Sequence, residues 1–261
     1  MEFPRKSLLD YVQVPTSFEE LDNKGNQINC FLSWKNTKLT KTHFREYVKF
    51  FEMNPEVKFI LFDDNLQQKW METFFGDHEI FSIYEGVKFE ASKSDIFRLC
   101  LLKKYGGIFI GINRVLDTPI YKFIRDKNQF VLSFDKNYYK RDKYPEAFPA
   151  EFKDFSVAQY IVIASKNHEV LNLAIKKIIE HAPLFNKVIF ESPKNAIWNF
   201  SAPYLLTHAV DDYIEIYGLE NISLCGFEYN GYSRIPNGAE YRYGFSPSYL
   251  GAKHQMILDY N

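Results

Sequence analysis

The feature that most constrains this chain is a segment that changes from a helical to a strand pattern across two adjacent glycines. Within residues 93–105, apolar side chains recur at helical spacing: Ile96, Leu99, Cys100 and Leu102. Gly106 and Gly107 follow, and glycine at this point ends a helix and permits a sharp turn. The apolar run 108–110 then predicts a buried strand, so the segment specifies a helix–turn–strand unit of an α/β sheet.

Polar side chains stand on the predicted helix and just beyond the predicted strand. Asp95 and Arg98 are three residues apart, which places them on one face of the helix. A pair of this kind is more often a structural ion pair than part of a site. Asn113 follows the strand, at the edge where open α/β sheets bind their ligands.

These residues together resemble the glycosyltransferases that carry a DXD sugar-binding motif. Their pattern is S/A-D-x-x-R, a helix, Y-G-G-I-Y and then D-x-D. The chain matches it, in order and spacing, with Ser94-Asp95, Arg98 and Tyr105-Gly106-Gly107-Ile108-Phe109. Where the family places D-x-D, the chain has Gly111-Ile112-Asn113. Weaker similarity extends over residues 29–254.

The resemblance implies a GT-A-type nucleotide-sugar-binding fold, and the absence of a linker or repeat predicts one domain over residues 1–261. Strand and helix patterns alternate, which predicts an α/β fold with a mostly parallel central sheet and helices on both faces. The expected strands are 29–34, 57–62, 108–110, 128–134 and 158–164. The expected helices are 42–52, 67–75, 93–105, 169–181 and 204–209.

By resemblance, the chain is an enzyme that moves a hexose from a nucleotide-diphosphate sugar, UDP- or GDP-linked, to a saccharide or glycolipid acceptor. Retention of anomeric configuration and a role in surface polysaccharide or glycolipid synthesis come with that resemblance. It implies that Asp95 and Arg98 contact the donor sugar, or that Arg98 orients Asp95. Trp34 stacks on the base in one interpretation and belongs to the core in another. Gly107 and Asn113 complete the expected donor-binding residues, and no catalytic residue is assigned.

The resemblance also implies a divalent cation, Mn²⁺ or Mg²⁺, with Asn113 and the late His254 as the candidate ligands. An asparagine amide is a neutral ligand, so three interpretations stay open. A cation binds weakly through Asn113, His254 and the diphosphate; or Lys and Arg side chains neutralise the diphosphate without a cation; or the site is degenerate. In the last case, the chain is a non-catalytic sugar or nucleotide binder.

Composition sets bounds on partners and location. The 32 basic and 33 acidic residues nearly cancel, which argues against a nucleic-acid partner. A nucleic-acid or protein-interaction module built on the Tyr- and Lys-rich stretch 136–144 is therefore the least favoured alternative. Three widely spaced cysteines indicate buried free thiols. Without a signal or membrane-spanning pattern, we expect a cytoplasmic protein, with peripheral contact at the inner face of a membrane left open.

Overall fold

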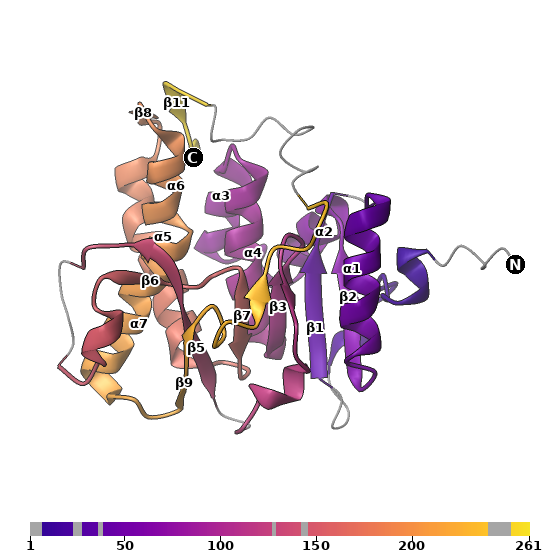
Figure 1. The fold of residues 1–261 in the computed structure, drawn as a ribbon. Helices are drawn as coiled ribbons and strands as arrows, with labels where there is room; N and C mark the ends of the chain where they lie inside the picture. Colours follow the sequence, from indigo (N-terminus) through magenta and orange to yellow (C-terminus); the bar gives the residue numbers. More distant parts are fainter. Residues whose placement is uncertain (1–6, 23–27, 36–38, 127–128, 142–145, 240–251) are drawn as a thin grey trace, which may run out of the picture.

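The computed structural model describes residues 7–22, 28–35, 39–126, 129–141, 146–239 and 252–261. A seven-stranded sheet runs through the middle of the molecule (Figure 1). Its hydrogen-bonded order is β2-β1-β3-β7-β5-β6, and β9 pairs with β5. The strands are β1 (Ile28–Ser33), β2 (Val57–Phe62), β3 (Gly107–Gly111), β5 (Phe130–Tyr138), β6 (Phe155–Val157), β7 (Ile161–Ala164) and β9 (Ile222–Phe227).

The sheet is mostly parallel, as the sequence predicts. β1 pairs in parallel with both β2 and β3, and β5 pairs in parallel with β9. β7 is antiparallel to both β3 and β5, so it joins two groups of strands that point the same way. β6 is also antiparallel to β5. β7 pairs with Phe130 and Val131 of β5, and β6 pairs with Phe134 and Tyr138 farther along β5. The carboxyl ends of β1, β2 and β3 therefore share one edge of the sheet with the amino end of β7.

Helices cover both faces of the sheet. The face covered by α1 (Lys41–Glu52) buries Cys30, Leu32, Ile108 and Ile110 against Tyr47 and Phe50. The opposite face buries Phe31 and Phe109 under a larger layer of helices. That layer comprises α2 (Asp64–Phe75), α3 (Glu79–Gly86), α4 (Glu90–Tyr105), α5 (Glu169–Phe185), α6 (Pro193–Phe200) and α7 (Pro203–Tyr217). Because successive side chains point to opposite faces, β1 and β3 each contribute residues to the hydrophobic cores on both faces of the sheet.

Two short strand pairs lie outside the main sheet. β4 (Val115–Leu116) pairs with β10 (Ser233–Arg234), which brings the 233–234 segment beside the turn that follows β3. β8 (Ile189–Phe190) pairs with β11 (Gln255–Met256), and both lie at the top of the view in Figure 1. Within the described residues, no helix is both long and apolar enough to cross a membrane.

Several element boundaries differ from the sequence-based expectation. α7 continues to Tyr217, eight residues beyond the predicted end at Ala209, because Val210, Tyr213 and Ile214 keep its apolar face buried. The predicted strand 158–164 is shortened to β7, the separate strand β6 precedes it at residues 155–157, and α3 and α6 were not predicted. All three cysteines are free and buried, as expected.

Candidate functional site

The turn between α4 and β3 requires both of its glycines. Gly106 has φ +66 and Gly107 has φ +97, values that side-chain-bearing residues rarely adopt. A Cβ on Gly106 would lie 2.5 Å from the backbone nitrogen of Lys166, and one on Gly107 would lie 2.6 Å from the carbonyl oxygen of Asn29. The predicted helix stop is therefore confirmed. Gly107 lies at the amino end of β3, whereas Asn113 follows the carboxyl end of the same strand, so Gly107 is far from the edge at which it was expected to bind a donor.

Asp95 and Arg98 form an ion pair on α4. Arg98 Nη2 lies 3.2 Å from Asp95 Oδ1, and the two side chains are 8% and 15% exposed. Arg98 Nη1 also donates to the carbonyl oxygen of Gln159, and its guanidinium lies 4.7 Å from the ring centroid of Phe109. Burial lowers the pKa of Arg98, and the charge of Asp95 opposes that shift. The guanidinium is fixed on several sides, so it can hold the Asp95 carboxylate in one orientation.

The end of β1 adjoins the same stretch of α4. Ser33 Oγ lies 3.1 Å from Ser94 Oγ, the residue before Asp95. The backbone N–H of Trp34 donates to the carbonyl oxygen of Phe62 at 3.0 Å, which fixes the end of β1 against the end of β2. The Trp34 ring is partly buried against the core on the α1 side. The structure thus places the end of β1, which Trp34 follows, beside the stretch of α4 that carries Asp95.

Asn113 lies in the turn that follows β3. Its Oδ1 would lie 3.1 Å from a Cβ at position 111, so the amide occupies space that Gly111 leaves free. The N–H of Gly111 donates to the carbonyl oxygen of Tyr160 at 2.7 Å, and the N–H of Arg114 donates to the carbonyl oxygen of Gly111 at 2.8 Å. These bonds close the turn and attach it to the segment before β7.

Side chains of α1 hold the carbonyl groups of this turn. Tyr47 OH donates to the carbonyl oxygens of Gly111, at 3.2 Å, and Arg114, at 2.9 Å. His43 Nε2 lies 2.7 Å from the carbonyl oxygen of Ile112. Because these contacts are buried or partly buried, α1 holds the backbone of the turn that follows β3 in place.

The described residues do not fit the divalent cation that a DXD motif would hold. Gly111 offers no ligand, and Asn113 offers one neutral amide oxygen, whereas Mn²⁺ and Mg²⁺ favour carboxylates. Across the described ranges, no three or more His, Cys, Asp or Glu side chains are grouped so that they could hold a metal ion. His254 is exposed and directly precedes β11, and no hydrogen bond or ion pair joins it to Asn113. Asp63, in the acidic turn after β2, caps α2 through its bond to the Leu66 N–H at 2.8 Å.

A buried ring of hydrogen bonds joins α4 to the start of α7. Ser92 Oγ lies 2.6 Å from Ser201 Oγ, and Gln159 Nε2 donates to the carbonyl oxygen of Ser201 at 3.1 Å. Arg98 completes the ring through its bond to the Gln159 carbonyl oxygen. The sequence analysis did not single out Ser92 or Gln159 as site residues, because nothing local marks a polar side chain whose partner is about 40 to 110 residues away.

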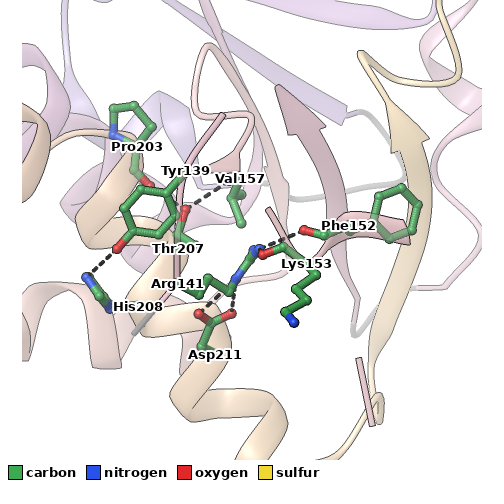
Figure 2. Close-up of polar contacts among 9 residues, drawn as sticks. All are labelled: Tyr139, Arg141, Phe152, Lys153, Val157, Pro203, Thr207, His208 and Asp211. Carbon is green, nitrogen blue, oxygen red and sulfur yellow. Dashed lines mark hydrogen bonds and ion pairs between the residues drawn. The ribbon is translucent and has the colours of Figure 1, made fainter. Parts of the chain in front are cut away.

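The Tyr- and Lys-rich stretch 136–144 is described in part, and the side chains of Tyr139 and Arg141 form contacts within the protein. Arg141 Nε donates to both carboxylate oxygens of Asp211, at 3.1 and 3.0 Å, in a buried pair (Figure 2). Tyr139 OH lies 2.7 Å from His208 Nε2, and the Tyr139 ring stacks on Tyr204 with centroids 4.2 Å apart. These contacts attach the end of β5 to α7.

Comparison with known proteins agrees with this geometry. Residues 41–131 match the family model "Glycosyltransferase sugar-binding region containing DXD motif". The matched region contains α1, α4, β3 and the turn with Asn113, although it lacks both aspartates. No curated protein sequence matches the chain.

Solved structures of glycosyltransferases are similar to the chain at low identity. One described as "PaToxG Glycosyltransferase" has 20% identity and a TM-score of 0.48, covering 74% of this chain and 71% of its own. The UDP-bound glycosyltransferase domain of the YGT toxin has 9% identity and a TM-score of 0.39, with 85% and 87% covered. The catalytic domain of the Clostridium novyi alpha-toxin has 10% identity and a TM-score of 0.37, with 73% and 64% covered. Likeness at this level specifies neither donor nor acceptor.

The family match therefore confirms the resemblance seen in the sequence. Residues 41–131 match the sugar-binding region of glycosyltransferases that carry a DXD motif.

Proposed function

We propose that the chain transfers a hexose from a UDP- or GDP-linked sugar to a hydroxyl group of a saccharide or glycolipid, with retention at the anomeric carbon. The observation that carries this proposal is the Asp95–Arg98 ion pair, which lies within the family-matched region and beside the end of β1. Carboxyl ends of strands are where open α/β sheets bind nucleotides. A glycolipid acceptor would bring the protein to the inner face of a membrane, in surface polysaccharide or glycolipid synthesis.

Asp95 is the residue we assign to the donor sugar. A carboxylate accepts hydrogen bonds from sugar hydroxyl groups, and its 15% exposure leaves it accessible. Arg98 is more deeply buried and is bound to Asp95 and Gln159, which supports a positioning role. Trp34 and Asn113, at the ends of β1 and β3, are assigned to the nucleotide and the diphosphate respectively.

The proposed reaction breaks the bond between the sugar C1 and the diphosphate oxygen and forms a bond between C1 and the acceptor oxygen. The acceptor hydroxyl loses its proton to the departing diphosphate, and the nucleoside diphosphate is released. Such a reaction depends mainly on positioning and on stabilising the negative charge of the leaving group. The loss of both DXD aspartates favours a competing proposal, a binder of sugar nucleotides that performs no transfer.

Nucleotide release from a set of UDP- and GDP-hexoses tests the proposal, with saccharide acceptors present and with either Mn²⁺ or EDTA. We expect one donor to be consumed, with the product retaining its anomeric configuration by NMR. Asp95→Asn should lower turnover at least about tenfold, since hydrogen bonds to a charged group are strong. Glu180→Gln removes an exposed carboxylate from α5 and serves as the matched control.

Each result decides between the two functions. Donor binding without transfer in any condition would favour the non-catalytic binder. Neither binding nor transfer would overturn both. Normal turnover by Asp95→Asn would remove Asp95 from the donor site.

A further inference from the structure

The reaction under "Proposed function" leaves one electrostatic requirement that the DXD positions do not meet. A departing nucleoside diphosphate carries about two to three negative charges, which enzymes stabilise with a cation or with Arg and Lys side chains. Gly111 and Asn113 contribute no charge to this end of β3. A positively charged side chain at the same edge of the sheet would supply the missing charge.

We propose that Arg114 binds the diphosphate of the donor in place of a divalent cation. This inference rests on the proposed function and names a residue that the family pattern does not include. Arg114 directly follows Asn113, and its guanidinium carbon lies 3.9 Å from the ring centroid of Tyr160. Its backbone is fixed by the hydrogen bonds to Gly111 and Tyr47.

Arg114 differs from the other buried or half-buried arginines in its charge environment. Arg98, Arg141 and Arg234 each form an ion pair with a carboxylate, at 3.2, 3.0 and 2.6 Å respectively. No ion pair joins Arg114 to any carboxylate in the part of the chain that the structure describes. Its Nε is buried and has no hydrogen-bond partner there either. A buried guanidinium donor without a partner is costly unless a ligand supplies the acceptor.

The stacking partner supports this role. Burial raises the pKa of Tyr160 well above its usual range, so the ring beneath Arg114 stays a neutral phenol and does not cancel the positive charge. Stacking on an aromatic ring also fixes the planar guanidinium, which suits bidentate contact with phosphate oxygens. A side chain already held in place loses less conformational entropy when it binds.

Hydrogen bonds and a ring contact link Arg114 to the segment that also holds Arg98. Tyr160, on which it stacks, accepts the Gly111 N–H, and the preceding residue Gln159 accepts from Arg98. Arg98 and Arg114 thus contact adjacent residues of one segment. The geometry fits a donor whose sugar meets Asp95 and whose diphosphate meets Arg114.

Calorimetry on the full chain tests the inference. The binding of UDP, UMP and uridine, and of GDP, GMP and guanosine, is measured with EDTA present to remove divalent cations. The wild type should bind the diphosphate without added metal and more tightly than the nucleoside. Arg114→Gln and Arg114→Met, the latter keeping contact with Tyr160, should each weaken diphosphate binding at least about tenfold and leave nucleoside binding unchanged. Arg114→Lys should show an intermediate loss. Arg125→Gln removes the same charge from an exposed site before β5 and is the matched control.

Three results would overturn the inference. Diphosphate binding that requires Mn²⁺ in the wild type would do so while leaving the proposed function intact. Equal diphosphate affinity in the wild type and both neutral variants, with unfolding curves confirming that the variants are folded, would remove Arg114 from the site. Absence of diphosphate binding under every condition would overturn the proposed function together with this inference.

Discussion

The side-chain oxygen of Asn113 lies 3.1 Å from the point where a Cβ at residue 111 would stand. The carbonyl oxygen of Tyr160 lies 3.3 Å from the same point. A small residue and a neutral amide thus fill the place where the family has two carboxylates. Position 111 is crowded but open to a side chain if the Asn113 amide rotates away, because the nearest atom belongs to a side chain.

Introducing both carboxylates should create a metal requirement that we do not expect of the wild-type chain. In Gly111→Asp/Asn113→Asp, two carboxylates two residues apart can reach one cation, and they also repel the diphosphate when no cation is bound. We expect UDP binding by the double variant to strengthen about tenfold or more when Mn²⁺ replaces EDTA, measured by calorimetry. Asn113→Asp alone is the control, and equal responses of wild type and double variant to Mn²⁺ would contradict the prediction.

A methyl group at Gly107 should destabilise the fold strongly. Gly107→Ala combines φ +97 with a contact of 2.6 Å to the backbone of Asn29, so the expected loss is about 3 kcal/mol or more. Gly218→Ala is the matched control, because Gly218 has φ +63 but no atom within 4 Å of its added Cβ. Its loss, from backbone strain alone, should be smaller, on the order of 1–3 kcal/mol. Urea unfolding measures both, and similar losses would show that backbone strain alone, without crowding, determines the cost.

Removing Asp211 should be more damaging than removing its ion pair as a whole. Asp211→Ala leaves the charge of Arg141 buried without its carboxylate, at a cost of about 3–5 kcal/mol in the free energy of unfolding. Arg141→Met/Asp211→Leu removes both charges and should recover most of that loss (Figure 2). The exposed pair on α5 provides a reference, since Glu180→Gln should change stability by less than about 1 kcal/mol. A double variant no more stable than Asp211→Ala would contradict this interpretation.

Glu46 should make stability fall in acid. Its contact with Lys49 at 2.7 Å and with Arg234 at 2.8 Å lowers the pKa of its carboxyl, against the opposing effect of burial. The charged form therefore stabilises the folded state above the unfolded pKa of about 4.3, and this stabilisation is lost as the pH falls through the lower folded value.

Unfolding of wild type and Glu46→Gln between pH 7 and pH 3 checks this prediction. The difference in stability between them should be largest near neutral pH and should shrink below about pH 5. Glu72→Gln, at an exposed position on α2, is the control. Parallel curves for wild type and Glu46→Gln would contradict the prediction.

Local signals in the sequence predicted the helix of the α4–β3 unit and the buried strand that ends shortly before Asn113. Those predictions succeeded because helical spacing, two glycines and a short apolar run act over neighbouring residues. The length of α7 was missed although Gly218 caps its carboxyl end, because burial against α5 and the sheet, which the local sequence does not show, stabilises its second half. Arg114 had one sequence signal, its place beside the missing aspartates. Its ring partner Tyr160 had none, because it reaches this turn through the pairing of β3 with β7.

The ring formed by Ser92, Ser201, Gln159 and Arg98 has a mechanical consequence. Each bond in it is buried, so none can be exchanged for a bond to water without first opening the structure. Separation of α4 from the start of α7 would break at least one of them. The stretch of α4 that carries Asp95 is therefore held to the junction of α6 and α7, so under the proposed function the orientation of the carboxylate would be set before a sugar binds.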